Sequence, residues 1–188
     1  MSAAIVLGVI AILIISVIKI HNGIINRYNA TVRAWADVVT EERNKNQLFP
    51  EIERLAESFK EHEGSVLKGV TELRAAISRI SENDIDTHQL KAIQTQTSSL
   101  IKNLVAVSEA YPELKSSEVF NNVIHKFTLQ QDNITASLRI FNRNVELFNS
   151  GIEIFPNSIV NNTFTKKVRL NRFHDHAAEA GFDYKPNF

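Results

Sequence analysis

The apolar side chains of this chain form one unbroken run at the N-terminus and periodic stripes after it. Residues 3–18 hold one Gly, one Ser and no charged side chain, and Ile20 extends the run past Lys19. About 20 apolar residues in a helix span the ~30 Å hydrocarbon core of a bilayer, so a transmembrane anchor is expected over residues 1–20. The alternative, a cleaved signal peptide, requires a basic leading segment and a small-residue cleavage site. The sequence has neither.

Beyond the anchor, apolar side chains recur at steps of three and four residues, which is the spacing of one helical face. The first stripe continues from the anchor until a polar run over residues 40–47, which predicts a turn near residues 44–47. Further stripes cover residues 48–80, 90–107 and 119–155.

Stripes of this kind joined by short connections predict an all-α fold. A transmembrane helix would continue into an antiparallel up-down four-helix bundle over residues 21–160, followed by an irregular basic and aromatic tail over residues 161–188. This order places residues 44–47 and 111–117 at the end of the bundle distal to the membrane. Residues 81–86, and everything after residue 155, would then lie near the bilayer.

Charge and composition narrow the function classes. The chain has 188 residues, with 21 Lys and Arg against 21 Asp and Glu. A nucleic-acid-binding protein needs a basic excess, so we expect no nucleic-acid partner. The absence of Cys excludes disulfides and thiolate metal sites.

The flanks of the anchor predict its orientation. Lys19, Arg27 and Arg33 follow the apolar run, and cytoplasmic flanks are enriched in Lys and Arg. We therefore expect a single-pass protein of the bacterial inner membrane, with its N-terminus outside and its bundle in the cytoplasm. A periplasmic bundle stays an alternative, because acidic side chains soon follow.

The tail carries a local basic patch. Its members, which lie close together without an acidic residue among them, are Lys166, Lys167, Arg169 and Arg172. With the interleaved Phe164, Val168, Leu170 and Phe173 they form a candidate contact with anionic lipid. The alternative is a solvated basic loop.

Sequence patterns for catalysis are missing. The chain has no phosphate-binding loop, no His-Glu-x-x-His, no Gly-x-Ser-x-Gly, and no His preceded by Glu at the spacing of a di-iron bundle. His174 and His176 form a close pair without an evident third ligand, and His62 is expected to be a core histidine. We therefore expect no catalytic, cofactor-binding or metal site, and no enzyme.

Several motifs resemble the LemA family of bacterial membrane proteins. The resemblance runs over residues 28–156, apart from the first half of the third helix. Its most distinctive elements are Ala-Trp-Ala-Asp-Val at residues 34–38, Leu-Phe-Pro at 48–50, Ala-Tyr-Pro-Glu-Leu at 110–114, Phe-Asn-x-x-Val at 141–145, Phe-Asn at 148–149 and Phe-Pro at 155–156.

The resemblance implies an N-terminal transmembrane helix, a helical bundle and no established enzymatic activity. Members are often encoded beside membrane zinc peptidases or TPM-domain proteins, which implies a protein partner in the envelope. Residues 41–45, residues 131–138 and the tail over residues 164–188 depart from the family pattern, so the resemblance implies no role for them.

These observations favour a non-enzymatic scaffold that recruits a membrane or envelope protein at its distal end. The candidate partner surface consists of Glu41, Arg43, Tyr111 and Pro112. The alternative function is sensing or remodelling of anionic lipid through the basic tail.

Overall fold

The computed structural model describes residues 2–57 and 63–174, and this part of the chain is helical without a strand. The main helices are α1 (Ser2–Asn44), α2 (Phe49–Glu57), α3 (Glu63–Arg79), α4 (Thr87–Ala110) and α6 (Glu118–Glu153). Shorter turns are η1 (Lys45–Gln47), α5 (Pro112–Lys115), α7 (Asn157–Val160) and η2 (Asn161–Thr165). The expected all-α bundle with a long N-terminal helix is confirmed.

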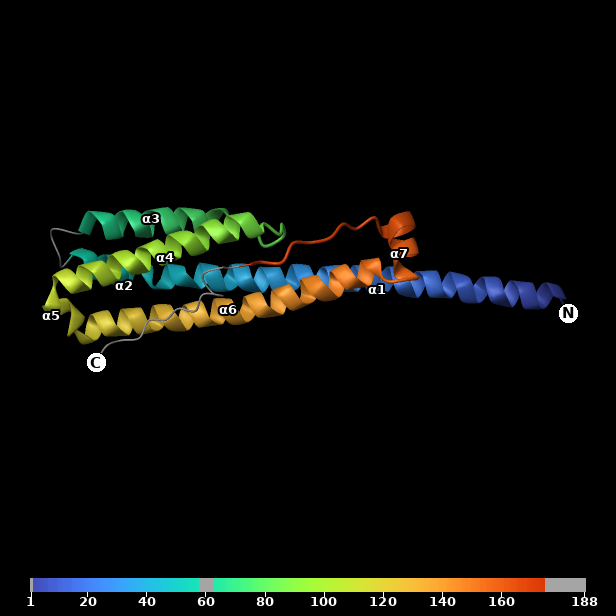
Figure 1. The fold of residues 1–188 in the computed structure, drawn as a ribbon, viewed down its shortest axis with the longest axis horizontal. Coiled ribbons are helices and arrows are strands. Elements are labelled where there is room, and N and C mark those ends of the chain that lie inside the picture. Colours follow the sequence, from blue (N-terminus) through green and yellow to red (C-terminus); the bar gives the residue numbers. More distant parts are fainter. Residues whose placement is uncertain (1, 58–62, 175–188) are drawn as a thin grey trace.

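α1 and α2 form one rod (Figure 1). The turn expected at residues 44–47 is wrong: the backbone tightens there into η1 and then continues as α2. The chain reverses only between α2 and α3, so the stripe from residue 48 onward begins on the first rod. Arg74 of α3 lies 2.9 Å from Glu53 of α2, as antiparallel neighbours require.

The polar run does not make a turn because its central side chains face the core. Glu42 and Lys45 are completely buried, and they pair with each other at 2.7 Å. A polar side chain with hydrogen-bond partners inside the bundle can stay buried, so the polar run remains helical.

Four rods, namely α1 with α2, α3, α4 and α6, enclose the main core. Its largest buried side chains include Trp35, Phe49, Phe127 and Phe141. The indole of Trp35 donates to the Ser81 carbonyl at 2.8 Å, so the α3–α4 connection lies at the level of Trp35. That level is about 22 Å along α1 from Ile20. The expectation that residues 81–86 lie near the bilayer is therefore wrong, because α3, with 17 residues, and α4, with 24, are each less than half as long as the 55-residue rod.

Nearer the membrane, α1 pairs with α6 alone, and the tail packs beside them. Tyr28 meets Phe148 edge-on at 5.5 Å. After α6, α7 and η2 turn the chain back, and residues 166–173 run as an extended segment toward the ends of α3 and α4 (Figure 1). Phe173, at its end, is buried in the main core, so the expected contact of this side chain with lipid is wrong.

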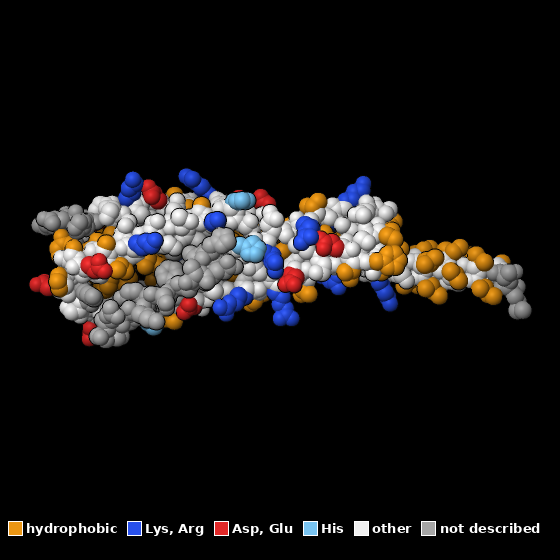
Figure 2. Space-filling model, viewed as in Figure 1, with side chains coloured by type: hydrophobic (Ala, Val, Ile, Leu, Met, Phe, Trp, Pro, Cys, Tyr) orange, Lys and Arg blue, Asp and Glu red, His pale blue; other side chains and the backbone are white. Residues whose placement is uncertain are grey.

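The N-terminal part of α1 projects from the bundle, and its apolar side chains are exposed (Figure 2). Within the described residues, this is the one helix long and apolar enough to cross a membrane. The structure therefore presents a single candidate anchor that continues without a break into the bundle.

Candidate functional site

The distal end of the molecule carries an open groove between α2, α5 and α6. It has a volume of about 440 Å³. Its apolar lining comes from Leu55, Leu114 and Val119, and its polar lining from Glu51, Arg54, Glu113 and Ser117. Leu114 and Leu55 are buried, whereas Val119 is 62% exposed. The groove thus offers an apolar floor with a charged rim.

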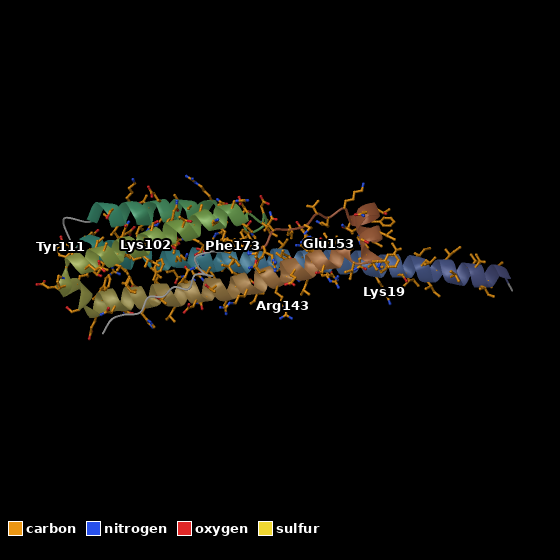
Figure 3. All side chains as sticks on the ribbon, in the orientation of Figure 1. Lys19, Lys102, Tyr111, Arg143, Glu153 and Phe173 are labelled. Carbon is orange, nitrogen blue, oxygen red and sulfur yellow. The ribbon has the colours of Figure 1, made fainter. Side chains whose placement is uncertain are left out.

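Local sequence signals shape this groove. Pro112 occupies the start of α5, where a missing N–H costs little. Ser117 caps α6, because its hydroxyl accepts from the Phe120 N–H at 3.1 Å. Each of these residues starts a new helix, and the chain therefore turns between α4 and α6. Tyr111 and Pro112 lie at the distal end, where the sequence placed them (Figure 3).

The exposed charges around the groove are mostly acidic. Glu57, Glu109, Glu113 and Glu118 are exposed at this end, against the one exposed cation Arg54 among the lining residues. Glu51 is compensated by Lys126, whose Nζ lies 2.9 Å from its carboxylate. The rim therefore favours a positively charged ligand.

Glu41 and Arg43 do not join the distal surface, which corrects the expected site. The Arg43 guanidinium contacts the Glu82 carboxylate and donates to the Ile80 carbonyl at 3.0 Å. The Glu41 carboxylate accepts from Gln130 of α6 at 2.9 Å. Both residues lie midway along the rod because the chain does not reverse after them.

A buried polar network crosses the core beside η1. Lys45 donates to Thr97 at 3.0 Å as well as to Glu42. Gln94 bridges onward, since it donates to Glu42 and accepts from Gln131 at 2.8 Å. Burial lowers the pKa of Lys45, and the Glu42 carboxylate opposes this shift without cancelling it.

The sequence contains a signal for this network, but the polar side chains of residues 40–47 hide it from a search for apolar stripes. Trp35, Val38, Glu42, Lys45, Phe49 and Ile52 step by three and four residues. The helical stripe therefore passes through the charged pair. Periodicity, taken without regard to polarity, would have located it.

The basic residues of the tail are mostly engaged within the chain. Lys167 Nζ lies 3.5 Å from the centre of the Tyr28 ring. Arg169 lies 2.8 Å from Glu153, and Arg172 lies 3.9 Å from Glu146. Lys166 is exposed. These contacts orient the extended segment along α6, and lipid contact by its four basic residues stays a prediction.

Asparagines of α6 hold the backbone of the extended segment, a feature that the sequence reasoning missed. Asn149 accepts from the Leu170 N–H and donates to the Leu170 carbonyl, both at 2.9 Å. Asn142 makes the same pair of bonds with Phe173 at 2.8 Å. Seven helical residues rise about 10.5 Å and three extended residues about 10 Å, so the two spacings match.

Groups that could support metal chemistry are few. His174 is exposed, while His176 and His62 lie outside the described residues. Among residues 2–57 and 63–174, no group of three or more His, Asp or Glu side chains could hold a metal ion.

Comparison with known proteins assigns the chain to a family. A family model described as the LemA family matches residues 34–181, which is most of the chain. Protein LemA of Metamycoplasma hominis is 30% identical to this chain over 97 residues, or 52% of this chain. The match covers 43% of that relative, less than half of its length. With its apolar N-terminal helix and its helical bundle, the chain belongs to the LemA family of membrane-associated proteins.

Proposed function

We propose that this protein is a non-enzymatic, membrane-anchored scaffold that presents a protein-binding groove at its distal end. The observation that carries the proposal is the groove lined by Leu55, Leu114 and Val119, with its acidic rim. Apolar pockets with a few charged groups around them are the usual form of a site that captures an anchoring side chain.

The length of the rod sets the distance between the groove and the bilayer. α1 and α2 run from Ile20 at the membrane to Glu57, which corresponds to about 55 Å at 1.5 Å per residue. Because α6 packs along most of that length, the groove stands away from the bilayer on a braced support. A partner held there would be kept at a set height above the membrane.

The lining of the groove specifies the chemistry of the partner. An apolar side chain would contact Leu114 and Val119, and neighbouring Lys or Arg side chains would face Glu113 and Glu118. We therefore propose a protein segment with an apolar anchor flanked by basic residues. The alternative function, lipid sensing by the basic tail, has weaker support because most of its cations are paired inside the chain.

Photocrosslinking in native membranes tests the proposal. A photoreactive amino acid in place of Val119 is expected to crosslink to a discrete protein. The matched control is Ile140, which is 58% exposed on the same helix but midway along the rod. The crosslinked segment of the partner should contain an apolar residue beside Lys or Arg.

A synthetic peptide with that segment then measures the groove directly. Binding to the purified full chain should weaken about tenfold or more for Val119→Arg, because the substitution removes an apolar contact and repels the basic flank. Ile140→Arg should bind like the parent. Equal crosslinking from both positions, or an acidic partner segment, would contradict the proposal.

A further inference from the structure

The turn at the end of α6 lies against the membrane-proximal part of α1. Val160 of α7 is buried in a small cluster with Ile24, Phe148 and Ile152. Val17 and Ile20 of α1 pack against the same cluster. Because Val17 and Ile20 belong to the last turns of the apolar run, α7 is placed at the edge of the hydrocarbon core.

The outer side of this turn is strongly apolar and exposed. The exposed fractions are 53% for Ile154, 79% for Phe155, 57% for Ile159 and 60% for Phe164. Figure 2 shows apolar side chains gathered at the base of the projecting helix, next to the bulge that Figure 1 labels α7. Large side chains of this kind in one patch mark a contact surface rather than a surface in water.

We propose that residues 154–164 form a membrane-docking wedge that inserts into the interfacial layer of the bilayer beside the anchor. The wedge is defined by Ile154, Phe155, Ile159 and Phe164. Its occupant is lipid because the turn packs on the cluster that Val17 and Ile20 of α1 contact, and therefore lies at the depth where the apolar run ends. This inference is independent of the distal groove.

Charge around the wedge agrees with a lipid surface. Lys19, which is exposed at the end of the apolar run, and Lys166, which is exposed just after η2, flank the patch. Basic side chains at this level face lipid headgroups, while neighbouring apolar side chains enter about 5–10 Å into the boundary with the acyl chains. A second point of contact beside the anchor would also limit the tilt of the rod.

The lack of Cys makes a direct depth measurement straightforward. The full chain would be reconstituted in nanodiscs of phosphatidylcholine and phosphatidylglycerol, with one environment-sensitive fluorophore attached at Thr163→Cys. Thr163 is polar and exposed within the wedge segment. The matched control is Thr128→Cys, which carries the same fluorophore at an exposed threonine in the distal half of α6.

The wedge predicts blue-shifted emission from Thr163→Cys and loss of its fluorescence when the lipids carry spin labels on their acyl chains. Thr128→Cys should show neither effect. Adding Phe155→Asp and Phe164→Asp to Thr163→Cys should restore water-like emission, although α1 keeps the chain in the nanodisc.

Two results would overturn the proposal. The first is emission from Thr163→Cys that matches the Thr128→Cys control. The second is a blue shift without quenching by lipid spin labels, since the patch would then be covered by protein, such as a second copy of the chain. Either result leaves the distal groove untouched, because its test uses a different surface.

Discussion

A completely buried ion pair stands out among the individual residues of this bundle. Lys45 and Glu42 are 2.7 Å apart and inaccessible to solvent. Buried pairs seldom add net stability over apolar side chains of similar volume, because both charges are desolvated. Thr97 and Gln94 of α4 meet this pair only when α1 and α4 are aligned as observed. We therefore interpret the network as a device that sets this alignment.

Removal of one charge should be far more damaging than removal of both. Lys45→Met leaves the Glu42 carboxylate buried without its cation, and we expect a loss of about 3–5 kcal/mol in the free energy of unfolding. Lys45→Met combined with Glu42→Leu should recover much of that loss. Urea unfolding of the detergent-solubilised chain, followed by the fluorescence of Trp35, measures both variants.

The control for this experiment is an exposed pair. Lys68 lies 3.8 Å from Glu72, and both side chains are largely in solvent. Lys68→Met should change the free energy of unfolding by no more than about 1 kcal/mol. A loss as large as that of Lys45→Met would show that burial is not the cause.

Lys45 should also give stability a specific dependence on pH. Its pKa in the folded chain is lowered from 10.5, so between the two values the unfolded chain binds more protons than the folded chain does. The free energy of unfolding therefore rises with pH in this window. Relative to Lys45→Met, the parent should gain stability as the pH approaches 10.5. Parallel pH profiles of the two proteins would contradict this assignment.

At the scale of elements, the pairing of α6 with the extended segment is the least ordinary contact. Asn142 and Asn149 each satisfy both backbone groups of one tail residue, as a neighbouring β-strand would. The tail thereby covers α1 and α6 where α3 and α4 no longer reach. An extended segment replaces two helices over this part of the bundle.

Asn149→Ala tests whether the amide holds the segment in place. The substitution removes the partners of the Leu170 N–H and carbonyl, so the stability of the segment should fall by about 1–3 kcal/mol. Hydrogen exchange at the amides of residues 167–173 should accelerate. Asn144→Ala is the matched control, because the Asn144 amide on the same helix donates to the carbonyl of Ile140 and not to the tail. In this variant, hydrogen exchange at residues 167–173 should stay unchanged.

The element boundaries show which sequence signals were sufficient. Asp86 caps the start of α4, because its carboxylate accepts from the N–H groups of His88 and Gln89. Pro112 and Ser117 likewise mark real boundaries. The predicted turn at residues 44–47 failed because a polar run was equated with exposure, whereas Lys45 has buried partners on α4. Of the four residues of the candidate partner surface, Tyr111 and Pro112 lie at the distal end although neither lines the groove. Glu41 and Arg43 lie elsewhere along the rod.

At the scale of the whole molecule, the structure is a rod with the candidate membrane anchor at one end. Figure 1 shows the anchor and the distal turn at opposite ends of its long axis. Basic side chains on the C-terminal flank of the anchor predict that the bundle lies in the cytoplasm.

Single cysteines test this orientation in intact cells. Asn83→Cys lies on the exposed α3–α4 connection, and it should react with a membrane-impermeant maleimide only after the cells are permeabilised. Ser2→Cys, at the opposite end of the anchor, should react in intact cells. The reverse pattern would place the bundle outside and would redirect the search for a partner to the cell exterior.

The sequence by itself determined the helices, the anchor and most of the core. These follow from the spacing of apolar residues, which is a property of neighbouring positions along one helix. Only the tertiary structure decided where the first rod ends, that Lys45 is buried and that the tail folds back onto α6. The physical reason is that a polar side chain is solvated or buried according to partners such as Thr97 or Leu170, which lie far away in the sequence.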